Sequence, residues 1–229
     1  MNSKNALSAL ALGIASLSAL LPLSASADAV IVNPLAGSIH WNSLGEGSTT
    51  SYGQTFKVAD ASNTRLDSFS FWLKSSLGTS RLRAYVAEWG GSGIVGPNLF
   101  AGTEFSGVYN NFTEIAVNTG GLNLDASKQY VAYFSAAGLF DGQGDGVFMG
   151  TSNFQNNYAN GSFVYDNSGS AAAGANWAGC HSDCPDVAFR LAFNQSSGAQ
   201  VPEPASFALT GIALLGMLAA RRRKGHAAR

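Results

Sequence analysis

Residues 66–73 read Leu-Asp-Ser-Phe-Ser-Phe-Trp-Leu, and this stretch decides the fold class. Successive side chains of an extended strand point to opposite faces, so Phe69, Phe71 and Leu73 share one face. The serines and Trp72 share the other face. This alternation with period two predicts a half-buried β-strand rather than a helix.

The same alternation continues on both sides of this stretch. It recurs over residues 82–87, 130–134 and 187–193, while no helical stripe longer than a turn or two occurs between residues 28 and 200. Many short strands separated by glycine-rich turns are typical of an antiparallel sandwich or barrel. We therefore expect an all-β domain, an antiparallel jelly-roll-like β-sandwich, over residues 28–193. Shorter strands are expected at 54–58, 99–104, 112–117, 147–151 and 161–165, and turns at 60–63, 75–80, 90–98, 118–123 and 141–146.

Composition excludes several classes of protein. The 229 residues include 2 cysteines, too few for a disulfide-dense scaffold or a four-thiolate zinc site. The net charge of −1 conceals an acidic centre, because residues 28–200 carry 7 basic and 13 acidic side chains. A nucleic-acid-binding domain would instead carry a basic patch on its folded part.

The N-terminus has the three parts of a secretory signal peptide. Lys4 supplies a positive charge, residues 6–23 form an apolar run, and small residues follow at 25–27. These parts in this order predict a signal helix over residues 1–27. We expect signal peptidase to cut between Ala27 and Asp28.

The C-terminus reads as a membrane segment that follows a short polar linker at 194–200. Residues 205–220 form an apolar stretch of 16 residues, which as a helix would reach ~24 Å. Flanking basic side chains can close part of the gap to a bilayer core of about 30 Å. We expect a single transmembrane helix whose basic end stays cytoplasmic. That basic anchor consists of Arg221, Arg222, Arg223 and Lys224.

Three C-terminal features occur in a fixed order: Pro202-Glu203-Pro204, a short apolar helix and an arginine cluster. In this order residues 201–229 resemble the PEP-CTERM sorting signal of Gram-negative bacteria that make extracellular polysaccharide. The resemblance implies an exosortase that cuts at or near the Pro-Glu-Pro motif. It also implies a membrane-anchored precursor and a mature protein at the cell surface or outside the cell. The alternative is a plain single-span anchor.

The order of segments between about residues 50 and 193 resembles the jelly-roll modules of secreted bacterial proteins. Such modules are similar in layout to carbohydrate-binding modules, so the resemblance implies an extracellular polysaccharide as a partner. Fold-level likeness does not by itself determine function. The site must be argued from particular residues.

Three groups of residues are candidates for a specific role. Cys180 and Cys184 are expected to form a disulfide, as cysteine pairs in exported proteins usually do, with a metal or redox site as the alternative. Asp141 and Asp145 lie in a glycine-rich loop that could hold calcium, which prefers oxygen ligands on a tightly curved backbone; the alternative is a polar turn. Trp177 lies in a Gly/Ala/Asn-rich segment and could stack on a sugar ring, with ordinary packing as the alternative.

Catalytic patterns are missing from the sequence. No strand carries a pair of carboxylates on one face, and no nucleophile elbow or phosphate-binding loop occurs. We therefore expect a protein that is not an enzyme and needs no cofactor, with calcium at Asp141 and Asp145 as the one candidate ion. We expect it to have a binding or structural role in the extracellular polysaccharide of a biofilm. Two alternatives remain open: a secreted polysaccharide hydrolase, and a structural surface protein that self-associates through strand edges.

Overall fold

The computed structural model describes residues 28–152, 158–169, 176–179 and 184–194. Within these ranges the chain forms β-strands and no helix, and every strand pair is antiparallel. The expected all-β, antiparallel fold class is confirmed. The finer assignment to a jelly roll stays a prediction.

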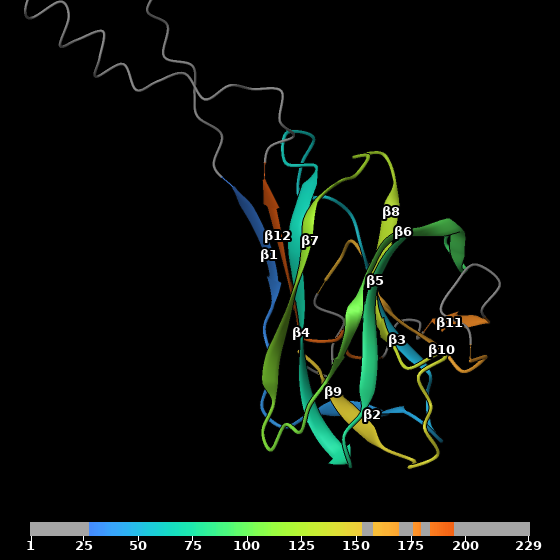
Figure 1. Cartoon of the computed structure of the whole chain (residues 1–229). Coiled ribbons are helices and arrows are strands. Elements are labelled where there is room, and N and C mark those ends of the chain that lie inside the picture. The colour runs from blue at the N-terminus through green and yellow to red at the C-terminus, as the bar shows by residue number, and fades with distance from the viewer. Residues whose placement is uncertain (1–27, 153–157, 170–175, 180–183, 195–229) are drawn as a thin grey trace, which may run out of the picture. The chain divides into compact units, whose positions relative to one another are not determined.

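Twelve strands of the described residues are divided equally between two sheets, which form the two layers seen in Figure 1. Sheet A has the order β1-β12-β4-β9-β2, and β7 pairs with β4 on the other side. Its strands are β1 (Ala29–Asn33), β2 (His40–Gly45), β4 (Arg65–Leu77), β7 (Thr113–Asn123), β9 (Gly146–Gly150) and β12 (Phe189–Asn194).

Sheet B has the order β11-β10-β3-β8-β5-β6. Its strands are β3 (Ser51–Phe56), β5 (Arg81–Trp89), β6 (Ile94–Ser106), β8 (Gln129–Ser135), β10 (Phe163–Asp166) and β11 (Trp177–Gly179). Consecutive strands β6 and β7 belong to different sheets. Each of them is the edge strand of its sheet, and they lie on the same side of the molecule.

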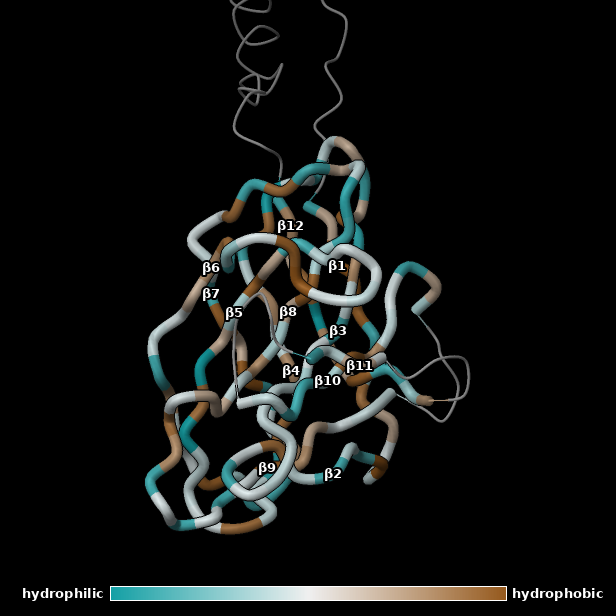
Figure 2. Tube along the Cα trace, turned by 90° about the vertical axis from the view of Figure 1, so that its right-hand side faces the viewer, coloured by the Kyte–Doolittle hydropathy of each residue, from teal (hydrophilic) through white to brown (hydrophobic). Residues whose placement is uncertain are grey.

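The main core lies between the two sheets. Phe69, Phe71 and Leu73 of β4 are each at most 1% exposed, as the alternation in residues 66–73 predicted. Phe134 of β8 meets them from sheet B, with ring centroids 5.9 Å from Phe69 and 5.1 Å from Phe71. Figure 2 shows hydrophobic and hydrophilic positions interleaved along the strands. Burial of the apolar faces of the central strands between the two sheets supplies most of the stabilisation.

A second, smaller cluster covers the outer face of sheet B. Tyr85 of β5 and Tyr133 of β8 stack with ring centroids 5.0 Å apart, and Trp89 lies in the same cluster. Gly53 of β3 makes room for it, because a Cβ atom at this position would lie 2.7 Å from the Cβ of Tyr133. Strands β5 and β8 are therefore buried on both faces.

The expected strand boundaries differ from the structure at β6 and β7. The segment expected as a turn at 118–123 continues β7 as far as Asn123, and Leu122 pairs with Leu66. The register between β4 and β7 shifts between Leu66 and Ser68. This irregularity accommodates Gly120 and Gly121, whose φ values of 72° and 84° suit glycine. The turn expected at 90–98 is likewise shorter, since β6 begins at Ile94. Strands β1, β2 and β11 were not expected.

Candidate functional site

A shallow depression lies on the outer face of sheet A, where the polar face of residues 66–73 points away from the core. Ser70 of β4 is paired with Ala116 of β7 on one side and with Arg190 of β12 on the other. The small side chains of Ser70, Ala116 and Ala192 leave a hollow of about 360 Å³. It is lined by Ser68, Phe69, Ser70, Glu114, Ala116, Arg190 and Ala192.

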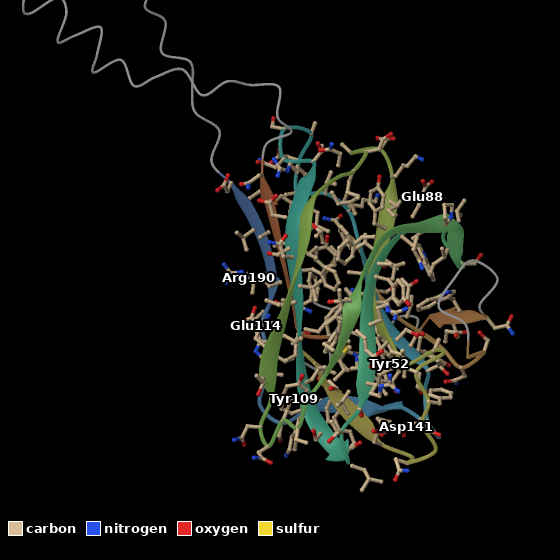
Figure 3. All side chains as sticks on the ribbon, in the orientation of Figure 1. Tyr52, Glu88, Tyr109, Glu114, Asp141 and Arg190 are labelled. Atoms are coloured by element: carbon tan, nitrogen blue, oxygen red, sulfur yellow. The ribbon has the colours of Figure 1, made fainter. Side chains whose placement is uncertain are left out.

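Two opposite charges flank this depression. Glu114 on β7 and Arg190 on β12 are both exposed, and Figure 3 shows both on the outer side of sheet A. They lie two strands apart across β4 and two residues out of register, which corresponds to about 12 Å between their backbones. A six-membered sugar ring fits between groups at this separation. The carboxylate accepts hydrogen bonds from hydroxyls and the guanidinium donates them.

The two charged groups differ in how they are held. Ser70 Oγ donates a hydrogen bond to Glu114 Oε1 at 2.6 Å, which orients the carboxylate. The three ion pairs among the described residues are Arg65–Asp67, Arg81–Glu104 and Lys128–Glu88, and Arg190 takes part in none of them. The guanidinium of Arg190 therefore keeps its donors for water or for a ligand.

Aromatic side chains continue from the depression along the same face. Trp72 is half-buried on β4 and lies directly opposite Glu114 in the register. Further along, the His40 ring lies 4.3 Å from that of Phe148 and 5.9 Å from that of Phe112. Aromatic faces next to hydrogen-bonding groups suit a sugar, whose C–H face packs on a ring while its hydroxyls bind at the edges.

A larger groove of about 520 Å³ lies between β6 and β7. Its lining carries no charged side chain and is apolar except for Thr103, Tyr109 and Asn118. Burial raises the pKa of the Tyr109 hydroxyl above its usual range. The groove and the depression together contain a single carboxylate, Glu114, among their lining residues. The groove is lined by Ala84, Phe100, Ala101, Gly102, Thr103, Phe105, Tyr109, Ile115, Ala116, Val117 and Asn118.

Trp177 does not lie on an open loop, because residues 177–179 form strand β11. The indole is half-buried, and its ring meets those of Tyr133 and Trp89 edge to face at 5.1 and 5.9 Å. Its Nε1 is buried without a hydrogen-bond partner among the described residues. Trp177 thus packs on the aromatic cluster of sheet B, and its role in glycan binding stays a prediction.

The acidic loop at 141–146 gains a neighbour that the sequence did not indicate. The Glu46 carboxylate accepts hydrogen bonds from the backbone N–H groups of Asp141 and Gly142, each at 2.9 Å. Burial, and then repulsion by Asp141 and Glu46, raises the pKa of Asp145. Within the described ranges no group of three histidine, cysteine or acidic residues could hold a metal ion. Calcium binding at Asp141 and Asp145 stays a prediction.

The remaining site residues of the sequence lie wholly or partly outside the described ranges. Cys184 takes part in a disulfide bond, while Cys180 is not described, so their pairing stays a prediction. The cleavage site at Ala27, the motif at 202–204 and the basic residues 221–224 also lie outside. No helix of the described ranges is long and apolar enough to cross a membrane, and residues 205–220 are not among them.

The sequence did not single out Ser70, Glu114 or Arg190 as a group. The polar face of residues 66–73 was visible, but nothing in the chain order indicated that β7 and β12 flank β4. Only the register brings residues 70, 114 and 190 onto one face.

Residues 200–224 match the family model of the PEP-CTERM protein-sorting motif. The match confirms the sorting signal that the Pro-Glu-Pro motif indicated. It marks an exported surface protein whose membrane-anchored precursor is processed by an exosortase. A search of curated proteins finds no match to this chain.

Proposed function

We propose that the sandwich of this exosortase-processed protein binds extracellular polysaccharide at the cell surface without catalysing a reaction. The observation that carries the proposal is the depression on sheet A. It places an oriented carboxylate at Glu114 and an uncommitted guanidinium at Arg190 on one solvent-facing surface, and Trp72 lies beside it on the same face of β4.

The chemistry of this surface suits a sugar. Sugars present hydroxyls, which pair with charged side chains, and C–H faces, which pack on aromatic rings. The small side chains of Ala116 and Ala192 leave the backbone close to solvent, so a flat ring can approach the sheet. An open depression also allows a polymer to continue beyond the site in both directions.

The number of carboxylates at this surface supports the proposal of a non-catalytic role. Glycoside hydrolysis ordinarily uses two carboxyl groups about 5–9.5 Å apart. The depression offers Glu114 alone among its lining residues. Glu114 and Arg190 are therefore assigned to holding the polymer.

The test is co-sedimentation of the protein from residue 28 to residue 200 with the extracellular polysaccharide of its host. We expect saturable binding that Trp72→Ala weakens at least tenfold and that Arg190→Ala and Glu114→Gln each weaken several-fold. Circular dichroism confirms that each variant keeps its β-sheet signal. A chelator arm tests calcium at Asp141 and Asp145 separately.

The matched control is Trp177→Ala, which removes the same side chain from the other sheet. If Trp177→Ala abolishes binding and Trp72→Ala does not, the glycan site lies on the aromatic cluster of sheet B. If the unaltered protein binds no polysaccharide with or without calcium, the proposed function is wrong.

A further inference from the structure

The side of the sandwich formed by β6 and β7 is open. Strand β6 is hydrogen-bonded only to β5, and β7 only to β4, so each leaves one edge unpaired within the described residues. These are long edges of 13 and 11 residues. Unpaired edges of this length present rows of backbone donors and acceptors, which readily pair with another strand.

Apolar side chains gather along this open side. Phe105, Ile115 and Val117 belong to the groove between the two edges and pack against the main core, yet they are only partly buried. Apolar surface next to unpaired strand edges is typical of an interface with another protein.

The lining of the groove carries no charge, although the domain around it is acidic. Two copies of an acidic domain repel one another over most of their surface. An uncharged side is where that repulsion is weakest. A sugar would leave the apolar floor poorly covered, whereas a second sandwich covers it with side chains of the same kind.

Strand β7 is better suited to pairing than β6. The register between β5 and β6 shifts twice, after Arg83 and after Val86, and such irregularities interrupt an edge. The pairing of β7 with β4 is regular from Thr113 to Asn118. This regular part provides a straight free edge.

The sequence of this edge is self-complementary. Residues 114–118 read Glu-Ile-Ala-Val-Asn. In an antiparallel pair of identical strands centred on Ala116, Ile115 faces Val117 of the second copy on the inner side. On the outer side Glu114 faces the amide of Asn118, and the two Glu114 carboxylates stay about 13 Å apart along the strands.

We propose that β7 pairs antiparallel with β7 of a second copy of this chain across a two-fold axis at Ala116. Sheet A then continues from one copy into the next. The open side of each copy covers the groove of the other, because the two-fold axis brings β6 beside β6 as well. The two depressions on sheet A also come to lie on one continuous face. The dimer itself does not depend on glycan binding.

The first test uses Ala116→Cys in the full chain, exported by its host. Residues opposite each other in an antiparallel pair have Cα atoms about 4.5–5.5 Å apart, which a disulfide spans. We expect a covalent dimer on a non-reducing gel. The matched control is Asn118→Cys on the same strand and face, which the proposed register places too far from its own copy to cross-link.

The second test uses Ala116→Arg, which places two cations face to face at the axis without entering the core. Analytical ultracentrifugation of the exported chain should show a dimer that this variant converts to a monomer. Ala192→Arg, on the outer face of β12, should leave the dimer intact. A monomeric unaltered chain overturns the proposal. So does equal cross-linking of both cysteine variants, or cross-linking of Ala116→Cys to a different protein.

Discussion

Ser70 Oγ donates a hydrogen bond to Glu114 Oε1 at 2.6 Å and so joins β4 to β7 on the outer face of sheet A. Ser70 is 2% exposed, whereas Glu114 is exposed. The buried hydroxyl therefore holds a carboxylate that still faces solvent. Such a bond orients the charged group before any ligand arrives, which lowers the entropic cost of binding.

Ser70→Ala should weaken polysaccharide binding several-fold, because Glu114 loses the donor that orients it. The free energy of unfolding should fall by only about 1 kcal/mol, as expected for one hydrogen bond. Affinity is measured by co-sedimentation and stability by urea unfolding. The matched control is Ser68→Ala, which removes a hydroxyl from the same depression without touching Glu114. Equal losses of affinity in the two variants would contradict an orienting role.

A buried polar link joins the two sheets near the start of β12. Gln54 Nε2 on β3 donates to Asp186 Oδ1 at 2.8 Å, and the backbone N–H of Tyr158 donates to Asp186 Oδ2 at 3.0 Å. Gln54 Oε1 in turn accepts from the backbone N–H of Val187. The side chains of Gln54 and Asp186 are each 1% exposed. Loss of one partner therefore leaves the remaining polar groups buried, where water cannot replace the lost hydrogen bond.

Asp186→Ala should lower the free energy of unfolding by about 3 kcal/mol, because it strands buried donors on Gln54 and Tyr158. Urea unfolding measures the loss. The double variant with Gln54→Ala should lose less than the sum of the two single variants, since both changes remove the same bond. Additive losses would show that the two residues act independently.

The strands that face the core could be predicted from the sequence because each repeats one simple pattern. Phe69 and Phe71 alternate with polar residues, and burial of one face requires that alternation. The edges could be predicted only in part, because residues 99–104 and 112–117 were expected as strands, whereas β1 and the end of β7 were not. Strand β1 holds exposed Val30 and Val32, and β7 holds glycines, so neither shows a clear polar face.

The candidate site was harder to predict than the fold. Ser70, Glu114 and Arg190 are separated by 44 and 76 positions, and only strand pairing brings them together. Trp177 was predicted to stack on a sugar ring because its neighbours in the sequence are rich in glycine and alanine. That composition does not reveal that Tyr133 and Trp89 lie beside its ring.

Tyr133 should make the fold sensitive to alkaline pH. Burial raises the pKa of its hydroxyl well above the usual range, against the opposing effect of a hydrogen bond to Asn98 at 2.7 Å. The unfolded chain releases the proton above about pH 10, while the folded chain retains it. Stability is therefore unaffected below this pH and falls as the pH rises further.

Tyr133→Phe should flatten the loss of stability above about pH 10, because phenylalanine has no proton to release. At neutral pH the variant should lose about 1 kcal/mol with the Asn98 bond. Urea unfolding between neutral and strongly alkaline pH, followed together with tyrosinate absorbance, measures both effects. The same alkaline slope in both proteins would exclude Tyr133 as its source.

Replacing Pro202, Glu203 and Pro204 by alanine should block processing and leave the sandwich unchanged. The three residues lie within the match to the sorting motif and follow the last described strand, which ends at Asn194. Proline fixes φ and has no backbone N–H, whereas alanine is the best helix former, so the replacement changes the backbone preferences of the motif itself. We expect the exosortase to cut the altered segment poorly for this reason.

Immunoblots of membrane and culture fractions measure this outcome. We expect the altered chain to accumulate as the membrane-bound precursor, with a mass larger than that of the processed protein. Its resistance to protease should match that of the unaltered chain, because the core between the sheets contains none of the replaced residues. Processing at the normal rate would mean that the exosortase recognises the apolar residues 205–220 and the basic residues 221–224 rather than the Pro-Glu-Pro motif.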